Sequence, residues 1–361
     1  MMMSDKIFSW LAAAVICSLL LTVGCAPLAE EAAKPEVEIA KPVPKPVVET
    51  TKPEVEVTKP VPEDVKAPAA TLALKFTPQD STTYKLTTEA QRRIEWEGPL
   101  PDKTAFTGGQ TGTKIEMTFT QQIQKVDDNG NALAEITIGG LKYRSIIKDS
   151  TILDFDSSRE KDKNSPMSGL IGCSYIVDIA PTGKVREVSY VERPQAAFKG
   201  GSQADKAALA LLQKNAIKER HGFLVLPDAD KNQLRTGGKW SSIKTFSFGM
   251  MGSKTYEKIY TLKEINDADG RRIIDVEMNA IPTAGQVGEE DTSSFSKMFD
   301  NTQTYTGQLK LDLTAGKIEK YLEKLESEWV AVDPSAGQQD DKEPAALKMT
   351  ATRFYHLEKI D

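Results

Sequence analysis

Alternation of apolar and polar residues dominates the chain from about residue 70 onward. In residues 113–138, apolar side chains occupy every second position on both sides of Asn129 and Gly130, a pair that tolerates the positive φ of a hairpin turn. Residues 254–278 repeat this arrangement, with a first strand that ends near Ile265 and a turn directly after it. Because successive side chains of a strand point to opposite faces, this period predicts long antiparallel strands with one buried face.

A second pair of similar hairpins follows in the same order along the chain. Residues 175–185 and 309–318 each consist of an apolar strand, an Asp, a short turn, a Gly-Lys pair and a second strand. Trp96 precedes the first set of hairpins and Trp240 precedes the second. Two matching hairpins in the same order predict an internal duplication of the β structure.

Residues 200–222 separate the two sets and predict one main helix, over 202–221. Ser202 and Asp205 form a capping-box pattern at its start, and Gly222 is a stop signal at its end. Apolar side chains, mostly alanine, recur at helical spacing along one face. An alanine face can lie close to a sheet, so we expect this helix to pack against the strands.

The expected fold class is therefore α+β, mostly β, with long antiparallel curved sheets and one main helix packed on a concave face. The first β repeat is expected over 71–199 and the second over 223–361, joined by the helix into one compact unit. This arrangement resembles the open β-barrels of lipoprotein carriers, in which a curved sheet holds a helix and can shelter an acyl chain. The hairpin pattern is also similar to that of uncharacterised bacterial lipoproteins.

The first residues follow a different pattern, since residues 7–23 form an unbroken apolar run after a short polar start. A run of this length at the N-terminus is typical of a secretory signal. The residues that end it, LTVGCA, resemble the lipobox of bacterial lipoproteins. The resemblance implies that residues 1–24 are a signal peptide, that cleavage falls between Gly24 and Cys25, and that Cys25 receives the lipid. An uncleaved membrane anchor and simple secretion are the two alternative interpretations.

Residues 25–70 combine the predicted lipidation site with a segment rich in Pro, Val, Lys and Glu. The pentapeptide KPEVE begins at Lys34 and again at Lys52. Prolines remove backbone donors, and isolated valines cannot form a core, so this segment is predicted to be a disordered tether. At ~3.1 Å per residue it reaches on the order of 100 Å. By resemblance to the sorting rule of enterobacterial lipoproteins, Ala26 favours the outer membrane, with the body facing the periplasm.

Composition and charge narrow the possible functions. The chain of 361 residues has 46 Lys and Arg against 52 Asp and Glu, a net charge of −6, which argues against a nucleic-acid partner. Its 2 His and 3 Cys leave little material for a metal or thiol site. We interpret Cys173 as a small buried hydrophobe, His221 as a residue that compensates the helix dipole, and His356 as a surface or edge residue of the last strand.

Two segments have features of ligand-binding loops but lack the required residues. The glycine-rich residues 108–114 lack the Gly-Lys-Ser/Thr ending of a phosphate loop, and they predict a flexible loop. Residues 154–158 resemble the start of a calcium loop. Arg159 and Ser165 stand where that loop requires a Gly and a final acid. A charged, solvated loop is therefore the better interpretation.

The expected function is that of a membrane-anchored envelope lipoprotein acting as a tethered structural or interaction module, without catalysis. Its expected partners are the membrane, through the lipid on Cys25, and another envelope protein or peptidoglycan. The alternative is binding or transfer of a lipid or other apolar ligand in the concavity of the sheet. A hydrolase that uses Asp and Glu is the second alternative. The sequence identifies no catalytic residue, metal ligand or cofactor.

Overall fold

The computed structural model describes residues 69–98, 108–190, 201–283, 299–332 and 346–360. The predicted signal peptide, Cys25 and nearly all of the predicted tether lie outside these residues. The strands of the first half are β2 (Ser81–Glu97), β3 (Gly109–Val126), β4 (Ala132–Ile147), β5 (Ser150–Asp156), β6 (Ser174–Ile179) and β7 (Val185–Tyr190). Those of the second half are β9 (Lys239–Ser247), β10 (Ser253–Ala268), β11 (Arg271–Pro282), β12 (Asp300–Asp312), β13 (Lys317–Val332) and β14 (Ala346–Lys359).

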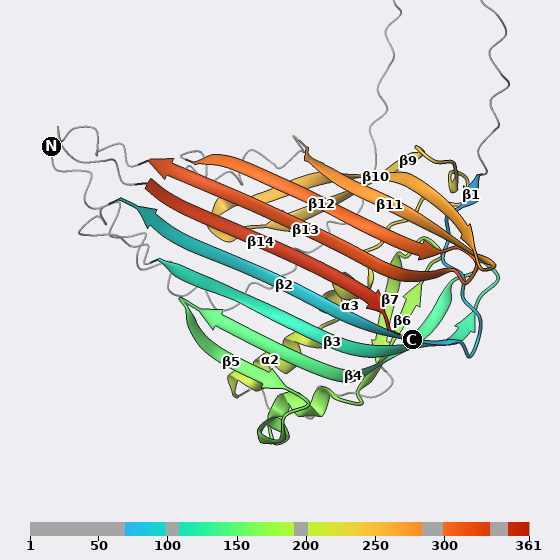
Figure 1. The fold of residues 1–361 in the computed structure, drawn as a ribbon. Coiled ribbons are helices and arrows are strands. Elements are labelled where there is room, and N and C mark those ends of the chain that lie inside the picture. Colours follow the sequence, from blue (N-terminus) through green and yellow to red (C-terminus); the bar gives the residue numbers. More distant parts are fainter. Residues whose placement is uncertain (1–68, 99–107, 191–200, 284–298, 333–345, 361) are drawn as a thin grey trace, which may run out of the picture.

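These strands form one antiparallel sheet of 12 strands within the described part of the chain (Figure 1). The order is β7-β6-β4-β3-β2-β14-β13-β12-β11-β10-β9, and β5 adds to β4. The two halves meet where β2 pairs with β14, with Leu86 opposite Leu357. The sheet curves strongly without closing, and a separate short pair joins β1 (Ala70–Thr71) to β8 (Gln233–Leu234). The expected fold class is confirmed.

Each half is a meander in which the two predicted hairpins occur in the predicted order. They are β3–β4 and β6–β7 in the first half, and β10–β11 and β12–β13 in the second. The prediction that a strand ends near Ile265 is wrong, because β10 continues to Ala268. Asp269 and Gly270 both have positive φ, 54° and 74°, and they form a tight two-residue turn that lets the ladder extend further.

The linking segment contains two helices and not the single helix predicted. Helix α2 (Gln203–Leu211) begins with the expected capping box, and α3 (Lys214–His221) follows an extended Gln213. In one continuous helix Ile217 would lie about 180° from Ala208, at 3.6 residues per turn. Both side chains are fully buried. The break after α2 turns Ile217 back towards the core. A single continuous helix could not bury both Ala208 and Ile217 against the same sheet.

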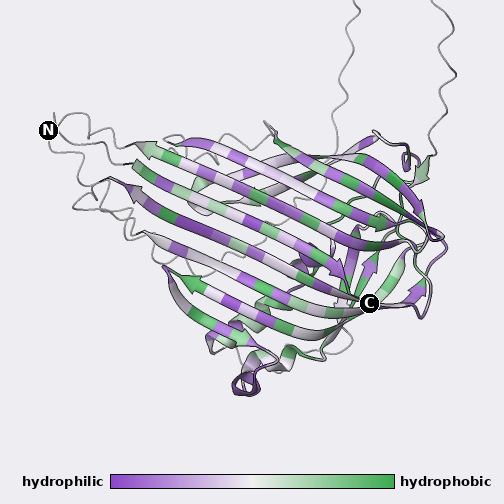
Figure 2. Ribbon diagram, viewed as in Figure 1, coloured by the Kyte–Doolittle hydropathy of each residue, from purple (hydrophilic) through white to green (hydrophobic). Residues whose placement is uncertain are grey.

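The concave face of the sheet carries the core. Apolar and polar residues alternate along the long strands (Figure 2), and the apolar positions are the buried ones. Figure 1 views the sheet from its convex side, with α2 and α3 behind it. The Tyr355 hydroxyl on β14 donates to the Arg220 carbonyl at 2.8 Å, which ties α3 to the concave face. Among the described residues, no helix is both long and apolar enough to cross a bilayer.

The segment that follows the predicted tether holds both halves together at one end of the strands. The Leu74 amide donates to the Pro181 carbonyl at 2.8 Å, in the turn between β6 and β7. The Lys75 amide donates to the Gly316 carbonyl at 3.1 Å, in the equivalent turn between β12 and β13. The Lys75 ammonium also donates to the Leu313 carbonyl at 2.5 Å. The first described residues therefore enter the body at this turn end.

Candidate binding site on the concave face

Three cationic side chains lie on the concave face towards the other end of the strands: Arg92 of β2, Lys254 of β10 and Arg353 of β14. In the register of the central pair, Arg92 is opposite Ala351 and Arg353 is opposite Ala90. The two arginines are therefore diagonal neighbours on one face, at a spacing of about 7–8 Å between backbones. We call Arg92, Lys254 and Arg353 the basic patch.

Aromatic rings bring Lys254 close to the two arginines although β10 is separated from β14 by three other strands in the sheet. The Arg353 guanidinium lies 5.0 Å from the Phe246 ring centre and 5.9 Å from that of Phe248. The Lys254 ammonium lies 5.6 Å from the Trp329 ring, and that ring is 5.1 Å from Phe248. These contacts place the basic patch around Phe248.

The loop between β9 and β10 reaches across the curved sheet and contacts side chains of the central strands β2 and β14. It contains a short 3₁₀ turn (Gly249–Met251), and a side chain added at Gly249 would lie 3.8 Å from Arg92 Nη1. Arg353 Nη2 donates to the Ser247 carbonyl at 3.0 Å. The edge strand β9 is thus connected to the central strands through the side chains of the basic patch.

The basic patch has unbalanced charge within the described residues. No described carboxylate lies within ion-pair distance of Arg92, Lys254 or Arg353. The exposed Glu219 on α3 acts on Arg353 only at longer range. Burial lowers the pKa of each of these three cations. Ala90, which shares their face, is nevertheless exposed. The patch is therefore partly desolvated yet open to an approaching ligand.

Two further cations lie nearby: Lys244 of β9, whose ammonium is 5.7 Å from the centre of the Phe246 ring, and Lys258, which is fully paired. The Lys258 ammonium lies 2.6 Å from the Glu323 carboxylate and donates to the Tyr321 hydroxyl at 3.2 Å. The Tyr305 hydroxyl donates to the same carboxylate. Burial disfavours the ammonium, but the adjacent carboxylate outweighs this effect and raises the pKa of Lys258. This pair is satisfied by its own neighbours and holds strands β10, β12 and β13 together.

His221 is the last residue of α3, and its side chain is buried in the core and not exposed to water. Its Nε2 is 2.8 Å from the Tyr175 hydroxyl, which also accepts a hydrogen bond from Arg220 at 3.2 Å. Burial, and secondarily the Arg220 charge, lowers the pKa of His221 to about 3. The interpretation of His221 as a residue that compensates the helix dipole is therefore wrong, because the ring is neutral.

The protonation of His221 predicts a pH dependence of stability. Below pH ~6.5 the unfolded chain binds a proton that the native imidazole does not bind, so the free energy of unfolding falls by about 1.4 kcal/mol per pH unit. The effect is absent above pH ~6.5 and ends near the native pKa of about 3. We expect His221→Gln to remove this slope in urea denaturation between pH 6.5 and 5. His356→Gln is the control that keeps most of it, and a wild-type stability unchanged over this range would contradict the prediction.

The remaining candidates from the sequence have structural roles. Residues 109–114 belong to β3 and are paired with β2, so the prediction of a flexible loop there is wrong. A Cβ at Gly112 would lie 2.6 Å from the Ala90 carbonyl, so the glycine allows the strands to approach closely. Cys173 is half-buried, contrary to prediction, and its thiol donates to the Gly169 carbonyl. His356 lies on the convex face of the central strand β14.

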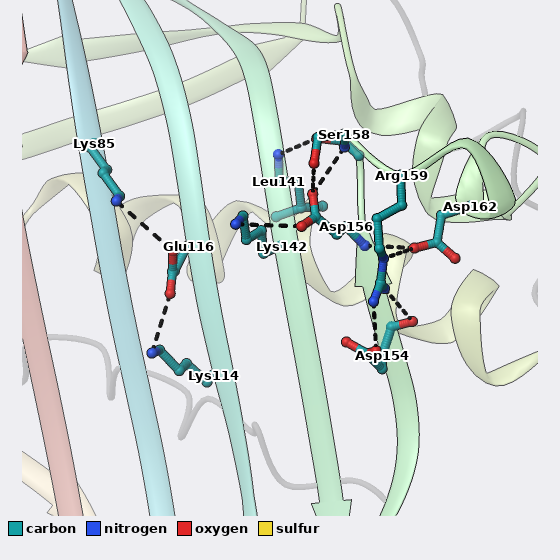
Figure 3. Close-up of polar contacts among 11 residues, drawn as sticks. Lys85, Lys114, Glu116, Leu141, Lys142, Asp154, Asp156, Ser158, Arg159 and Asp162 are labelled. Carbon is teal, nitrogen blue, oxygen red and sulfur yellow. Dashed lines mark hydrogen bonds and ion pairs between the residues drawn. The ribbon is translucent and has the colours of Figure 1, made fainter.

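Residues 154–158, which include Asp154 and Asp156, lie largely on strand β5 and not in the predicted loop. Arg159 pairs with Asp154 at 2.8 Å and with Asp162 at 2.6 Å (Figure 3). Asp156 accepts hydrogen bonds from Ser158 and pairs with Lys142. The carboxylates are therefore occupied by protein donors. Over the described ranges, no group of three or more acidic, His or Cys side chains is arranged to hold a metal ion.

A small cavity lies near the turn end, remote from the basic patch. It has a volume of about 50 Å³ and is lined in part by Tyr84, Phe119, His221 and Phe223. Ligand pockets usually start at about 300 Å³. This cavity has the size of a water site and does not hold an acyl chain.

No protein-family model and no curated protein matches this chain. The basic patch was also missed by inspection of the sequence, because its members lie on three separate strands. The sequence nevertheless contains a pattern that indicates the patch, because each cation occupies a position that the alternation of apolar and polar residues assigns to the inward face. Arg353 falls between Ala351 and Tyr355 in that series, and Arg92 falls between Ala90 and Ile94. Cations at inward positions of a curved sheet are a reason to look for a ligand site.

Proposed function

We propose that this chain is a lipid-anchored envelope protein that acts as a tethered, non-catalytic interaction module, with the concave face around the basic patch as its binding surface. Cys25 is the proposed attachment point and residues 26–70 the spacer. The observation that carries the proposal is the partly desolvated, unbalanced basic patch. Uncompensated cations in a partly buried site are costly, and they are typical of binding surfaces.

The position of the tether supports the same function. Leu74 and Lys75 attach it to the turn end of both halves, whereas the basic patch lies towards the other end of the strands. β3 has 18 residues, so the two ends are separated by about 60 Å at ~3.3 Å per residue. A module tied at one end and open at the other can reach a partner away from its anchor.

Binding or transfer of an apolar ligand is the second candidate function. Half-buried apolar side chains, Ile94 and Trp96 of β2 and Phe246 of β9, adjoin the basic patch on the concave face. They support a ligand with an apolar part, bound at the patch and not in the cavity at the turn end.

Substitution of Cys25 tests the anchor. We expect the wild-type chain to sediment with the outer-membrane fraction and Cys25→Ala to lose the lipid and shift to another fraction. Mass spectrometry of the N-terminal peptide checks the acyl modification directly. If Cys25→Ala fractionates as the wild type does and retains residues 1–24, the uncleaved anchor replaces the lipoprotein interpretation.

Photocrosslinking tests the binding surface without assuming the chemistry of the partner. A benzophenone amino acid is introduced at Ala90, which is exposed on the concave face, or at Arg93, which is exposed on the convex face of the same strand. We expect envelope components to be crosslinked from position 90 and not from position 93. Equal labelling from both positions would contradict a concave binding surface.

A further inference from the structure

We infer that the basic patch binds the phosphate group of an amphiphilic molecule, whose apolar part lies against Ile94, Trp96 and Phe246. This inference rests on the proposed binding surface and names the chemistry of its ligand. Arg92 and Arg353 supply the principal contacts and Lys254 supplies a third positive charge.

The first argument is charge. Arg92 and Arg353 are diagonal neighbours on adjacent strands, and like charges so placed repel each other in a partly desolvated site. Lys254 lies over the ring of Trp329, which packs against Phe248, and its ammonium donates to the Asn301 amide oxygen, which is neutral. Within the described residues, the nearby Glu323 carboxylate is already taken by Lys258 at 2.6 Å. An anion bound between the two arginines would balance the patch.

The second argument is geometry. A guanidinium presents five N–H donors in a planar fork that matches two oxygens of one anion. Among the described residues, Arg353 uses one nitrogen, Nη2, on the Ser247 carbonyl, and Arg92 has no hydrogen-bond or ion-pair partner. Two forks and an ammonium offer more donors than one carboxylate can accept. A terminal phosphate has three oxygens available and matches this set better.

The third argument is the mixed surroundings of the patch. Ile94 and Trp96 continue the inward face of β2 beyond Arg92, and both are half-buried. Phe246, also half-buried, lies 5.0 Å from the Arg353 guanidinium. A free inorganic ion would leave these apolar side chains in contact with water. An alkyl chain attached to the phosphate would cover them.

Equilibrium dialysis of radiolabelled hexyl phosphate against the full-length chain in uncharged detergent micelles tests the inference. Hexyl phosphate is short enough to remain mainly in water, and empty micelles correct for partitioning. We expect saturable binding to the wild-type chain. Arg92→Gln and Arg353→Gln are each expected to weaken binding roughly tenfold or more, because each removes charge-assisted hydrogen bonds. Arg93→Gln is the matched control on the convex face and is expected to bind like the wild type.

Three competitors separate the possible ligands. Unlabelled hexyl phosphate is expected to displace the probe at much lower concentration than inorganic phosphate or hexanol. If inorganic phosphate displaced the probe at the same concentration as hexyl phosphate, the patch would be a simple anion site. That result would overturn the inference that the ligand is an amphiphile. Tighter displacement by an acidic peptide would assign the patch to a protein partner instead.

A second measurement guards against variants that fail to fold. Arg92→Gln removes like-charge repulsion, so its thermal midpoint is expected to equal or exceed that of the wild type. A stable variant without binding therefore supports the inference. Absence of saturable hexyl phosphate binding to the wild-type chain overturns it. The proposed interaction module would still stand in that case if position 90 is crosslinked selectively.

Discussion

Glu323→Ala is expected to lower the free energy of unfolding by about 3–5 kcal/mol, because it leaves the buried Lys258 ammonium without its carboxylate. The Lys258 side chain is 4% exposed and that of Glu323 is 12% exposed, so water cannot replace the lost partner. The Tyr305 hydroxyl loses its acceptor at the same time. Urea denaturation of the full-length chain at neutral pH measures the change.

Two further variants test whether the buried Lys258–Glu323 pair is the cause of the lost stability. Lys263 and Glu277 form a similar ion pair between β10 and β11, but their side chains are 55% and 45% exposed. Glu277→Ala is therefore expected to cost less than about 1 kcal/mol. The double variant Lys258→Met with Glu323→Leu is expected to recover most of the loss, since apolar residues of similar volume replace buried ion pairs well. Equal losses for Glu323→Ala and Glu277→Ala would contradict the buried pair as the cause.

Gly316→Ala is expected to destabilise the chain by about 2–5 kcal/mol, from the strain of positive φ and from overpacking. Gly316 has a φ of 66°, and an added Cβ would lie 2.3 Å from the backbone nitrogen of Lys75. The substitution pushes away the segment that joins the two halves and breaks the hydrogen bond from the Lys75 amide. Hydrogen exchange of residues 72–76 is expected to become faster.

Gly270→Ala provides the matched control in another hairpin turn. Gly270 has a φ of 74° and no atom within 4 Å of the added Cβ. Only the backbone strain remains, so the expected cost is about 1–2 kcal/mol. Exchange of residues 72–76 is expected to be unchanged. If Gly316→Ala and Gly270→Ala lowered the free energy of unfolding by the same amount, the contact between Lys75 and the turn would not contribute to stability.

The long strands and their turns could be predicted from the sequence because they depend on local rules. An inward residue at every second position and a Gly in each turn define the hairpins without knowledge of their neighbours. The same rules failed at 109–114, where glycines suggested a loop. Gly112 is required there by the Ala90 carbonyl of the adjacent strand, and no local pattern contains that contact.

The linking helices and His221 also show that sequence patterns predict local features but not those that depend on packing. The capping box at Ser202 was predicted because all its atoms lie within one turn. The break after α2 depends on which side chains the sheet can bury, and the neutral state of His221 depends on Tyr175 and Arg220. Those are properties of packing and desolvation, which arise only when separate elements meet.

By itself, the sequence determined the duplicated order of hairpins, the mostly β fold and the position of the linking helices, because period and turn chemistry are local. The tertiary structure alone decided that β2 pairs with β14 and that the loop after β9 reaches across the curved sheet. Arg92, Lys254 and Arg353 come together through those two long-range events. A binding surface built from the central pair β2 and β14 together with the distant strand β10 exists only after the sheet has curved, which is why its chemistry could not be seen along the chain.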